Sequence, residues 1–217
     1  MSHATIPCTE EVVRIPSGSV MIEGGLGLPR VPRGVVLFAH GSGSNRHSPR
    51  NGYVAEALRD AGLATLLIDL LTPEEEQFYE SWFDVEVLEQ RMLAATRWLR
   101  TDERTRALPI GYFGSSTGAS AALSAAAEEG ASIRAVVSRG GRPDLAPHAW
   151  PRVQSPTLFI VGGDDAGIVD LNRDAHDALS CEKQLAIVPG ASHLFEEPGA
   201  LDEVARLSAR WFAKHLG

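Results

Sequence analysis

The chain has 217 residues, 44% of them hydrophobic and 22% charged, and this balance excludes a chain that is disordered throughout. Its 28 acidic and 20 basic residues give a formal net charge of −8, which argues against nucleic acid or an anionic membrane as the main partner. Two cysteines cannot build a disulfide scaffold, and they lack metal-ligand spacing. No linker or repeat divides the chain, so we expect one domain over residues 1–217.

The N-terminal residues carry neither the basic nor the apolar region of a secretory signal. No run of 18 uncharged apolar residues follows, so a membrane span is not expected either. We therefore expect a cytoplasmic protein.

Strand-length apolar runs alternate with amphipathic stretches along the chain. An opening hairpin is expected from residues 11–15 and 20–24, and further strands at 35–39, 63–70, 110–113, 133–138, 157–161 and 184–188. Helices are expected over 51–60, 85–100, 119–129, 170–179 and 201–216. This alternation predicts an α/β fold in which helices cover both faces of a mostly parallel, twisted sheet.

Four of the expected strands end in polar or glycine-rich segments, at residues 40–43, 114–118, 162–165 and 189–193. The carboxyl ends of parallel strands meet at one edge of a sheet, where chemistry gathers. The segment 114–118 reads Gly-Ser-Ser-Thr-Gly and matches G-x-S-x-G, a tight strand-to-helix turn that lifts a nucleophilic serine above the sheet. Ser116 is therefore the candidate nucleophile, and the alternative is a serine that only caps the following helix.

A serine hydroxyl needs a base, and in this architecture an acid and then a histidine follow the serine in the chain. Of the histidines near the C-terminus, His176 and His215 fall within expected helices, whereas His193 lies in a loop after a strand. His193 is thus the candidate base. Asp165 is favoured as its carboxylate over the adjacent Asp164, because Gly162 and Gly163 allow a sharp turn first, and Asp170 is a weaker third choice.

The glycine-rich segment after the strand at 35–39 is where a second oxyanion donor is expected. We expect donors from the backbone amides of Thr117 and Ser42, with Gly43 as the alternative to Ser42. His40 is interpreted as a buried histidine that holds the loop. A rival interpretation of the same segment, a dinucleotide fingerprint that uses Asp69, lacks its third glycine.

Side chains near this edge could contact a substrate. Phe78, Tyr79 and Trp82 are candidate substrate-binding residues, as an aromatic rim over the site, although such a cluster could equally pack onto the core. Four loop arginines could together hold a carboxylate or phosphate, but scattered surface arginines are the preferred interpretation: Arg46, Arg50, Arg139 and Arg142. The run of glutamates at 74–76 is interpreted as a solvated helix start.

These motifs agree in type and order, and the chain resembles the α/β-hydrolase superfamily, in particular small dienelactone-hydrolase-like serine hydrolases. The stretches that carry the resemblance are VVLFAHGSGSNRHSP at 35–49, IGYFGSSTG at 110–118, TLFIVGGDD at 157–165 and IVPGASHLFEEPG at 187–199. The resemblance implies an α/β-hydrolase sheet, an antiparallel opening strand and a Ser116–His193–Asp165 triad. No large cap domain is expected within 217 residues. Dienelactone hydrolases proper use cysteine as the nucleophile, so Ser116 favours a general carboxylesterase.

We therefore expect a serine hydrolase that acts on small carboxylic esters through an acyl-enzyme, with no metal or organic cofactor. Two alternatives stay open at this point. One is a hydrolase-fold protein that binds a ligand without turnover, and the other is an acyltransferase that uses the same triad. The sequence leaves the natural substrate and the oligomeric state undetermined.

Overall fold

A long hairpin forms the antiparallel edge of the sheet. In the computed structural model, which describes residues 8–217, β1 (Cys8–Ser17) pairs with β2 (Val20–Pro29), and β2 also pairs antiparallel with β4 (Ala64–Ile68). Both strands of the hairpin extend well beyond the expected 11–15 and 20–24. The expected absence of a secretory signal rests largely on residues 1–7, which lie outside the described residues.

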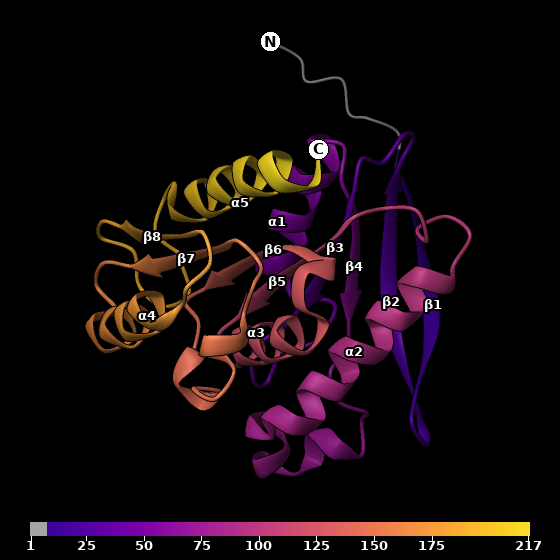
Figure 1. The fold of residues 1–217 in the computed structure, drawn as a ribbon, viewed down its shortest axis with the longest axis horizontal. Helices are drawn as coiled ribbons and strands as arrows, with labels where there is room; N and C mark the ends of the chain where they lie inside the picture. Colours follow the sequence, from indigo (N-terminus) through magenta and orange to yellow (C-terminus); the bar gives the residue numbers. More distant parts are fainter. Residues whose placement is uncertain (1–7) are drawn as a thin grey trace.

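The rest of the sheet is parallel. Its other strands are β3 (Val35–Ala39), β5 (Ile110–Ser115), β6 (Ile133–Arg139), β7 (Thr157–Gly162) and β8 (Lys183–Val188). The spatial order is β1-β2-β4-β3-β5-β6-β7-β8, and the strand direction turns steadily from β1 to β8 (Figure 1). Every residue of β3, β4, β5 and β7 is buried, which explains why the sequence of these strands is continuously apolar.

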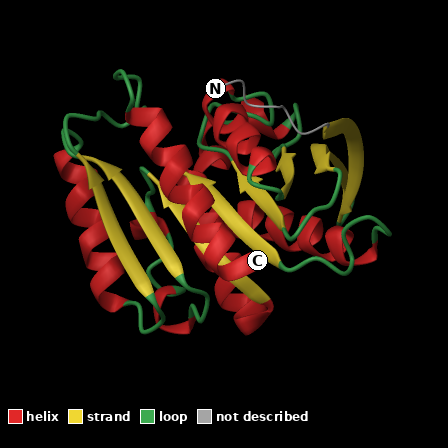
Figure 2. Ribbon diagram, turned by 90° about the horizontal axis from the view of Figure 1, so that it is seen from above, coloured by secondary structure: helices red, strands yellow, loops and turns green. Residues whose placement is uncertain are grey.

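Helices cover both faces of the sheet (Figure 2). The core beneath α1 (Pro49–Asp60) and α5 (Ala200–Leu216) includes Phe38 of β3, and the core beneath α2 (Val85–Thr101), α3 (Thr117–Glu129) and α4 (Ala166–Ala178) includes its neighbour Leu37. Successive strand residues point to opposite faces, so β3 contributes to both cores. The predicted α/β fold is confirmed, and no separate cap domain is evident in residues 8–217.

Two helix boundaries bear on the site. The helix expected at 170–179 begins earlier, at Ala166. Its first turn is exposed and carries no apolar pattern, so the sequence does not indicate this start. Between β4 and α2 the chain forms two short 3-10 helices, Glu75–Gln77 and Tyr79–Phe83, rather than an α-helix. No helix of the described chain is both long and apolar enough to cross a bilayer.

Candidate functional site

Ser116 occupies a strained turn between β5 and α3. Its φ of +51° and ψ of −121° lie in a region that non-glycine residues rarely adopt. Two backbone hydrogen bonds hold the turn. The Ser116 amide donates to the Arg139 carbonyl at 3.1 Å, and the Ser116 carbonyl accepts from the Arg142 amide at 3.0 Å. The surrounding hydrogen bonds thus fix a backbone conformation that presents Ser116 at the carboxyl edge of the sheet.

Glycines on either side of this turn make it possible. A Cβ at Gly114 would lie 2.5 Å from the Cα of Ala119, and a Cβ at Gly118 would overlap with the carbonyl oxygens of Ala39 and His40. Strand β5, helix α3 and the end of β3 therefore approach one another more closely than any side chain allows.

Replacing Gly118 by alanine is expected to lower the free energy of unfolding by at least about 2 kcal/mol, because the clashing atoms belong to the backbone. Urea unfolding of both proteins measures this change. Gly52→Ala is the matched control, since Gly52 lies in α1 with no atom near its would-be Cβ, and a gain of about 0.5–1 kcal/mol is expected there. Equal stability of Gly118→Ala and the wild type would contradict the close approach.

Asp165, rather than Asp164, reaches the imidazole of His193. The Asp165 Oδ2 lies 2.6 Å from the His193 Nδ1, whereas Asp164 is exposed and its backbone amide donates to the Ala191 carbonyl at 3.0 Å. The carboxylate follows β7 and the imidazole follows β8, so adjacent parallel strands bring together two residues that are 28 positions apart.

The loops that carry these two side chains are fixed to one another. The Gly163 amide donates to the Val188 carbonyl at 2.8 Å, and the carboxylate of Glu197 accepts the Ser192 amide at 3.0 Å. Hydrogen bonding by the Ser192 side chain, and then by its backbone amide, lowers the pKa of Glu197. The loop that carries His193 is thus stabilised by a hydrogen bond between two of its own residues.

Ser116 and His193 flank the same short segment after β6. The Arg139 carbonyl accepts a hydrogen bond from the Ser116 amide. A Cβ on the next residue, Gly140, would lie 3.5 Å from the His193 Nδ1. On its other side Ser116 touches Gly41, where an added Cβ would come within 3.0 Å of the Ser116 Cβ. Ser116, His193 and Asp165 therefore lie along the same carboxyl edge of the sheet, and His193 and Asp165 are in direct contact.

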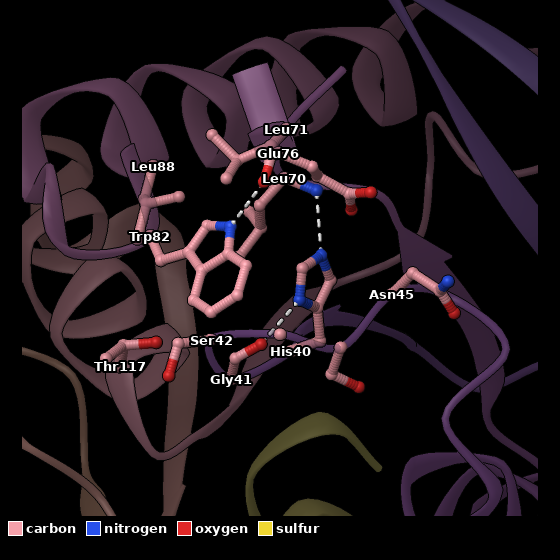
Figure 3. Close-up of a pocket in the computed structure, with 12 residues that line it drawn as sticks. His40, Gly41, Ser42, Asn45, Leu70, Leu71, Glu76, Trp82, Leu88 and Thr117 are labelled. Carbon is pink, nitrogen blue, oxygen red and sulfur yellow. Dashed lines mark hydrogen bonds between the residues drawn. The ribbon is translucent and has the colours of Figure 1, made fainter. Parts of the chain in front are cut away.

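A cavity of about 200 Å³ opens next to the Ser116 turn (Figure 3). Its floor comes from the loop after β3 and from Thr117, and its walls come from the end of β4, the 3-10 segment and α2. The cavity contains both expected oxyanion donors, Ser42 and Thr117. Neither of their backbone amides, nor that of Gly43, donates a hydrogen bond to another described residue. These amides are free to bind a developing negative charge, and Gly43 remains an alternative to Ser42.

His40 holds the loop that forms the cavity floor. It is 5% exposed, its Nδ1 donates to the Gly41 carbonyl at 2.9 Å, and its Nε2 accepts from the Leu70 amide at 3.0 Å. This pattern requires a neutral imidazole. Burial lowers the pKa of His40, against the opposing effects of the Gly41 carbonyl and Asp69.

The lowered pKa of His40 makes stability depend on pH. Below about pH 6.5 the unfolded chain takes up a proton at this residue that the folded chain rejects, so the free energy of unfolding falls as the pH drops. The expected slope is at most about 1.4 kcal/mol per pH unit. Urea unfolding at pH 6.5 and 5.5 should show a smaller loss for His40→Gln than for the wild type. An equal loss in both proteins would contradict a neutral, buried His40.

Of the three candidate aromatic residues, one lines the cavity. Trp82 lines the cavity, and its Nε1 donates to the Glu76 carbonyl at 3.1 Å. Phe78 and Tyr79 are 63% and 64% exposed and do not line it. The cavity is also lined by Glu76, a residue expected from the sequence to lie in a solvated helix start. Glu76 reaches the cavity because of where the 3-10 segment lies relative to β4 and α2, and no local sequence pattern predicts this placement.

Three of the four loop arginines pair with carboxylates. Arg46 pairs with Asp69 and Glu23, and the other pairs are Arg50–Glu196 and Arg142–Asp144. Arg139 differs, because it is buried, its Nε and Nη1 have no partner in the described chain, and its guanidinium lies 5.8 Å from the Phe195 ring centroid. Burial, and then the neighbouring Arg50, lower the pKa of Arg139 to about 10. Arg139 does not line the cavity.

The dinucleotide interpretation has no support in the geometry. Helix α1 begins only at Pro49 and not directly after Gly43, so no helix N-terminus follows the glycines. Asp69 is engaged by the backbone amide and the guanidinium of Arg46 and is not free for a ribose. No cluster of three or more potential metal ligands occurs among residues 8–217.

The chain matches one known protein family and two curated relatives. A model of the dienelactone hydrolase family matches residues 23–215. Two proteins from Mycobacterium tuberculosis strains, each named "Putative phosphoribosyl transferase", are 55% identical to the chain over 210 residues. The match covers 97% of this chain and 47% of each relative, so the chain spans about half the length of these curated relatives.

Solved structures resemble the chain over nearly its whole length. A dienelactone hydrolase from Anabaena variabilis is 54% identical with a TM-score of 0.94, and the match covers 97% of this chain and 99% of that one. Est1E from Butyrivibrio proteoclasticus has the same fold, with a TM-score of 0.82 at 14% identity, covering 94% of this chain and 98% of that one.

Proposed function

Because this chain belongs to the dienelactone hydrolase family, we propose that it is a serine hydrolase that cleaves small carboxylic esters through an acyl-enzyme on Ser116. Family membership supports an enzyme of the hydrolase kind. The observation that carries the finer proposal is the hydrogen bond between Asp165 and His193 at the sheet edge where Ser116 occupies its strained turn. The free amides of Ser42 and Thr117 beside it supply a site for the oxyanion.

In the proposed reaction His193 removes the hydroxyl proton of Ser116 as the oxygen attacks the ester carbonyl. The Asp165 carboxylate accepts the Nδ1–H of His193, which leaves Nε2 as the base and stabilises the imidazolium that forms. The amides of Thr117 and Ser42 donate to the oxyanion. His193 then protonates the departing alcohol, and water attacks the acyl-enzyme with the same base.

The small cavity supports short substrates. Its volume of about 200 Å³ is below the range of typical ligand pockets, and Leu70, Leu71, Leu88 and Trp82 give it apolar walls. No cap domain among residues 8–217 extends it. A short acyl or alcohol group fits this space better than a long aliphatic chain.

An ester panel tests the proposal. The wild-type protein should hydrolyse p-nitrophenyl acetate and butyrate with a higher kcat/KM than the octanoate. Absence of turnover above the buffer rate for all three esters, with a folded protein, would contradict the proposal and favour a ligand-binding protein with the same fold.

A further inference from the structure

The cavity beside Ser116 has one acidic side chain in its lining, Glu76. Its neighbours in the run of glutamates are engaged elsewhere or exposed. Glu75 pairs with Arg91 at 2.6 Å and accepts the Thr72 amide at 2.8 Å, and Glu74 is exposed. The Glu76 carboxylate has no hydrogen bond or ion pair with any described residue. Glu75 is therefore held by Arg91 and Thr72, and Glu76 places an unpaired carboxylate at the cavity.

Negative charge dominates this wall of the cavity. Asp69 is close enough to act on the charge of Glu76, and the guanidinium of Arg46 is shared between Asp69 and Glu23. Burial, and then the charge of Asp69, raise the pKa of Glu76, and no cationic side chain of the described residues pairs with this carboxylate. The other titratable side chain in the lining, His40, is held neutral by its hydrogen bonds. The surroundings leave the charge of Glu76 uncompensated.

An aromatic ring shares the cavity with this carboxylate. The Nε1–H of Trp82 is used by the carbonyl of Glu76 itself, so the indole offers a substrate its ring rather than a hydrogen-bond donor. Figure 3 shows the indole above Ser42 and the Glu76 carboxylate on the side of the cavity where Asn45 lies. An aromatic ring together with a carboxylate is the combination that recognises ammonium groups.

We propose that this cavity binds an ammonium group on the substrate and that Glu76 is the residue that determines this specificity. The inference rests on the proposed ester hydrolysis, since it names the chemistry of the group that enters the cavity beside Ser116. A net charge of −8 supports it, because the field of the whole protein attracts a cationic ester.

Matched esters test the inference. Butyrylcholine and 3,3-dimethylbutyl butyrate differ only in a trimethylammonium group that replaces a tert-butyl group of the same shape. We expect kcat/KM to be at least tenfold higher for the cationic ester, and the ratio to fall below about threefold in Glu76→Gln. Glu74→Gln removes one charge from the same segment outside the cavity, and its ratio should stay that of the wild type.

The ammonium group could belong to either half of the ester. A second pair, betaine methyl ester and methyl 3,3-dimethylbutanoate, places the charge in the acyl half. The rates of both pairs are divided by those of alkaline hydrolysis. A Glu76-dependent preference in either pair supports the inference and identifies the half. Equal normalised rates in both pairs, or a preference that Glu76→Gln retains, would overturn it.

A binding measurement separates this inference from the proposed hydrolysis. Calorimetric titration with choline and with 3,3-dimethylbutan-1-ol needs no turnover. We expect choline to bind at least tenfold more tightly, and Glu76→Gln but not Glu74→Gln to abolish the difference. If no ester is hydrolysed but choline binds in this way, the proposed function fails and the ammonium site stands. If esters are hydrolysed and the two alcohols bind equally, the ammonium site is wrong and the hydrolase proposal stands.

Discussion

Replacing Ser116 by alanine is expected to lower kcat/KM for p-nitrophenyl butyrate by about 10⁴-fold or more. The acyl-enzyme cannot form without the hydroxyl, and the residual rate then comes from the free amides and from binding alone. Initial rates over a range of ester concentrations, with background hydrolysis subtracted, measure the change.

The Ser116→Ala variant should remain folded. Ser116 takes part in the turn through its backbone amide and carbonyl, and alanine keeps both. Circular dichroism and a thermal melt close to those of the wild type establish this. A folded variant that retains more than about a tenth of the wild-type activity would show that another group is the nucleophile.

Replacing Asp165 by asparagine is expected to lower kcat/KM by about 10³–10⁴-fold, with little loss of stability. The amide keeps the shape of the carboxylate but cannot hold the Nδ1–H of His193 in the same way or stabilise its charged form. The 2.6 Å contact between the two side chains is the basis of this prediction. The same ester assay measures it.

Asp164 provides the matched control. It is adjacent in the chain, carries the same charge and is exposed, and the imidazole of His193 contacts Asp165 instead. Asp164→Asn should retain activity within about threefold of the wild type. If Asp164→Asn lost as much activity as Asp165→Asn, the assignment of the carboxylate to Asp165 would be untenable.

The parallel sheet could be predicted from the sequence because its strands are buried on both faces. Continuous apolar runs mark β3 and β7 within one residue of their observed bounds. The edge elements are harder, since solvent exposure removes the signal. The hairpin strands extend beyond their alternating centres, and the first turn of α4 carries no apolar periodicity.

The candidate site was predictable where it depends on strand ends and unpredictable where it depends on packing between distant segments. Ser116 and His193 stand out because each follows a strand in a glycine-containing loop. Asp165 could only be preferred over Asp164, because the direction of adjacent loop side chains depends on how the loops after β7 and β8 pack. Likewise, the exposure of Tyr79 and the position of Glu76 depend on how the 3-10 segment lies on β4 and α2, which is tertiary information.

Labelling with a fluorophosphonate, followed by intact-protein mass spectrometry and peptide mapping, tests most directly whether Ser116 is activated. These reagents react with a serine whose hydroxyl is activated by a neighbouring base. The predicted result is one adduct, located on Ser116, which is absent from Ser116→Ala and much slower to form in Asp165→Asn. A folded wild-type protein that forms no adduct, or that carries its adduct on another residue, would contradict the proposed serine hydrolase.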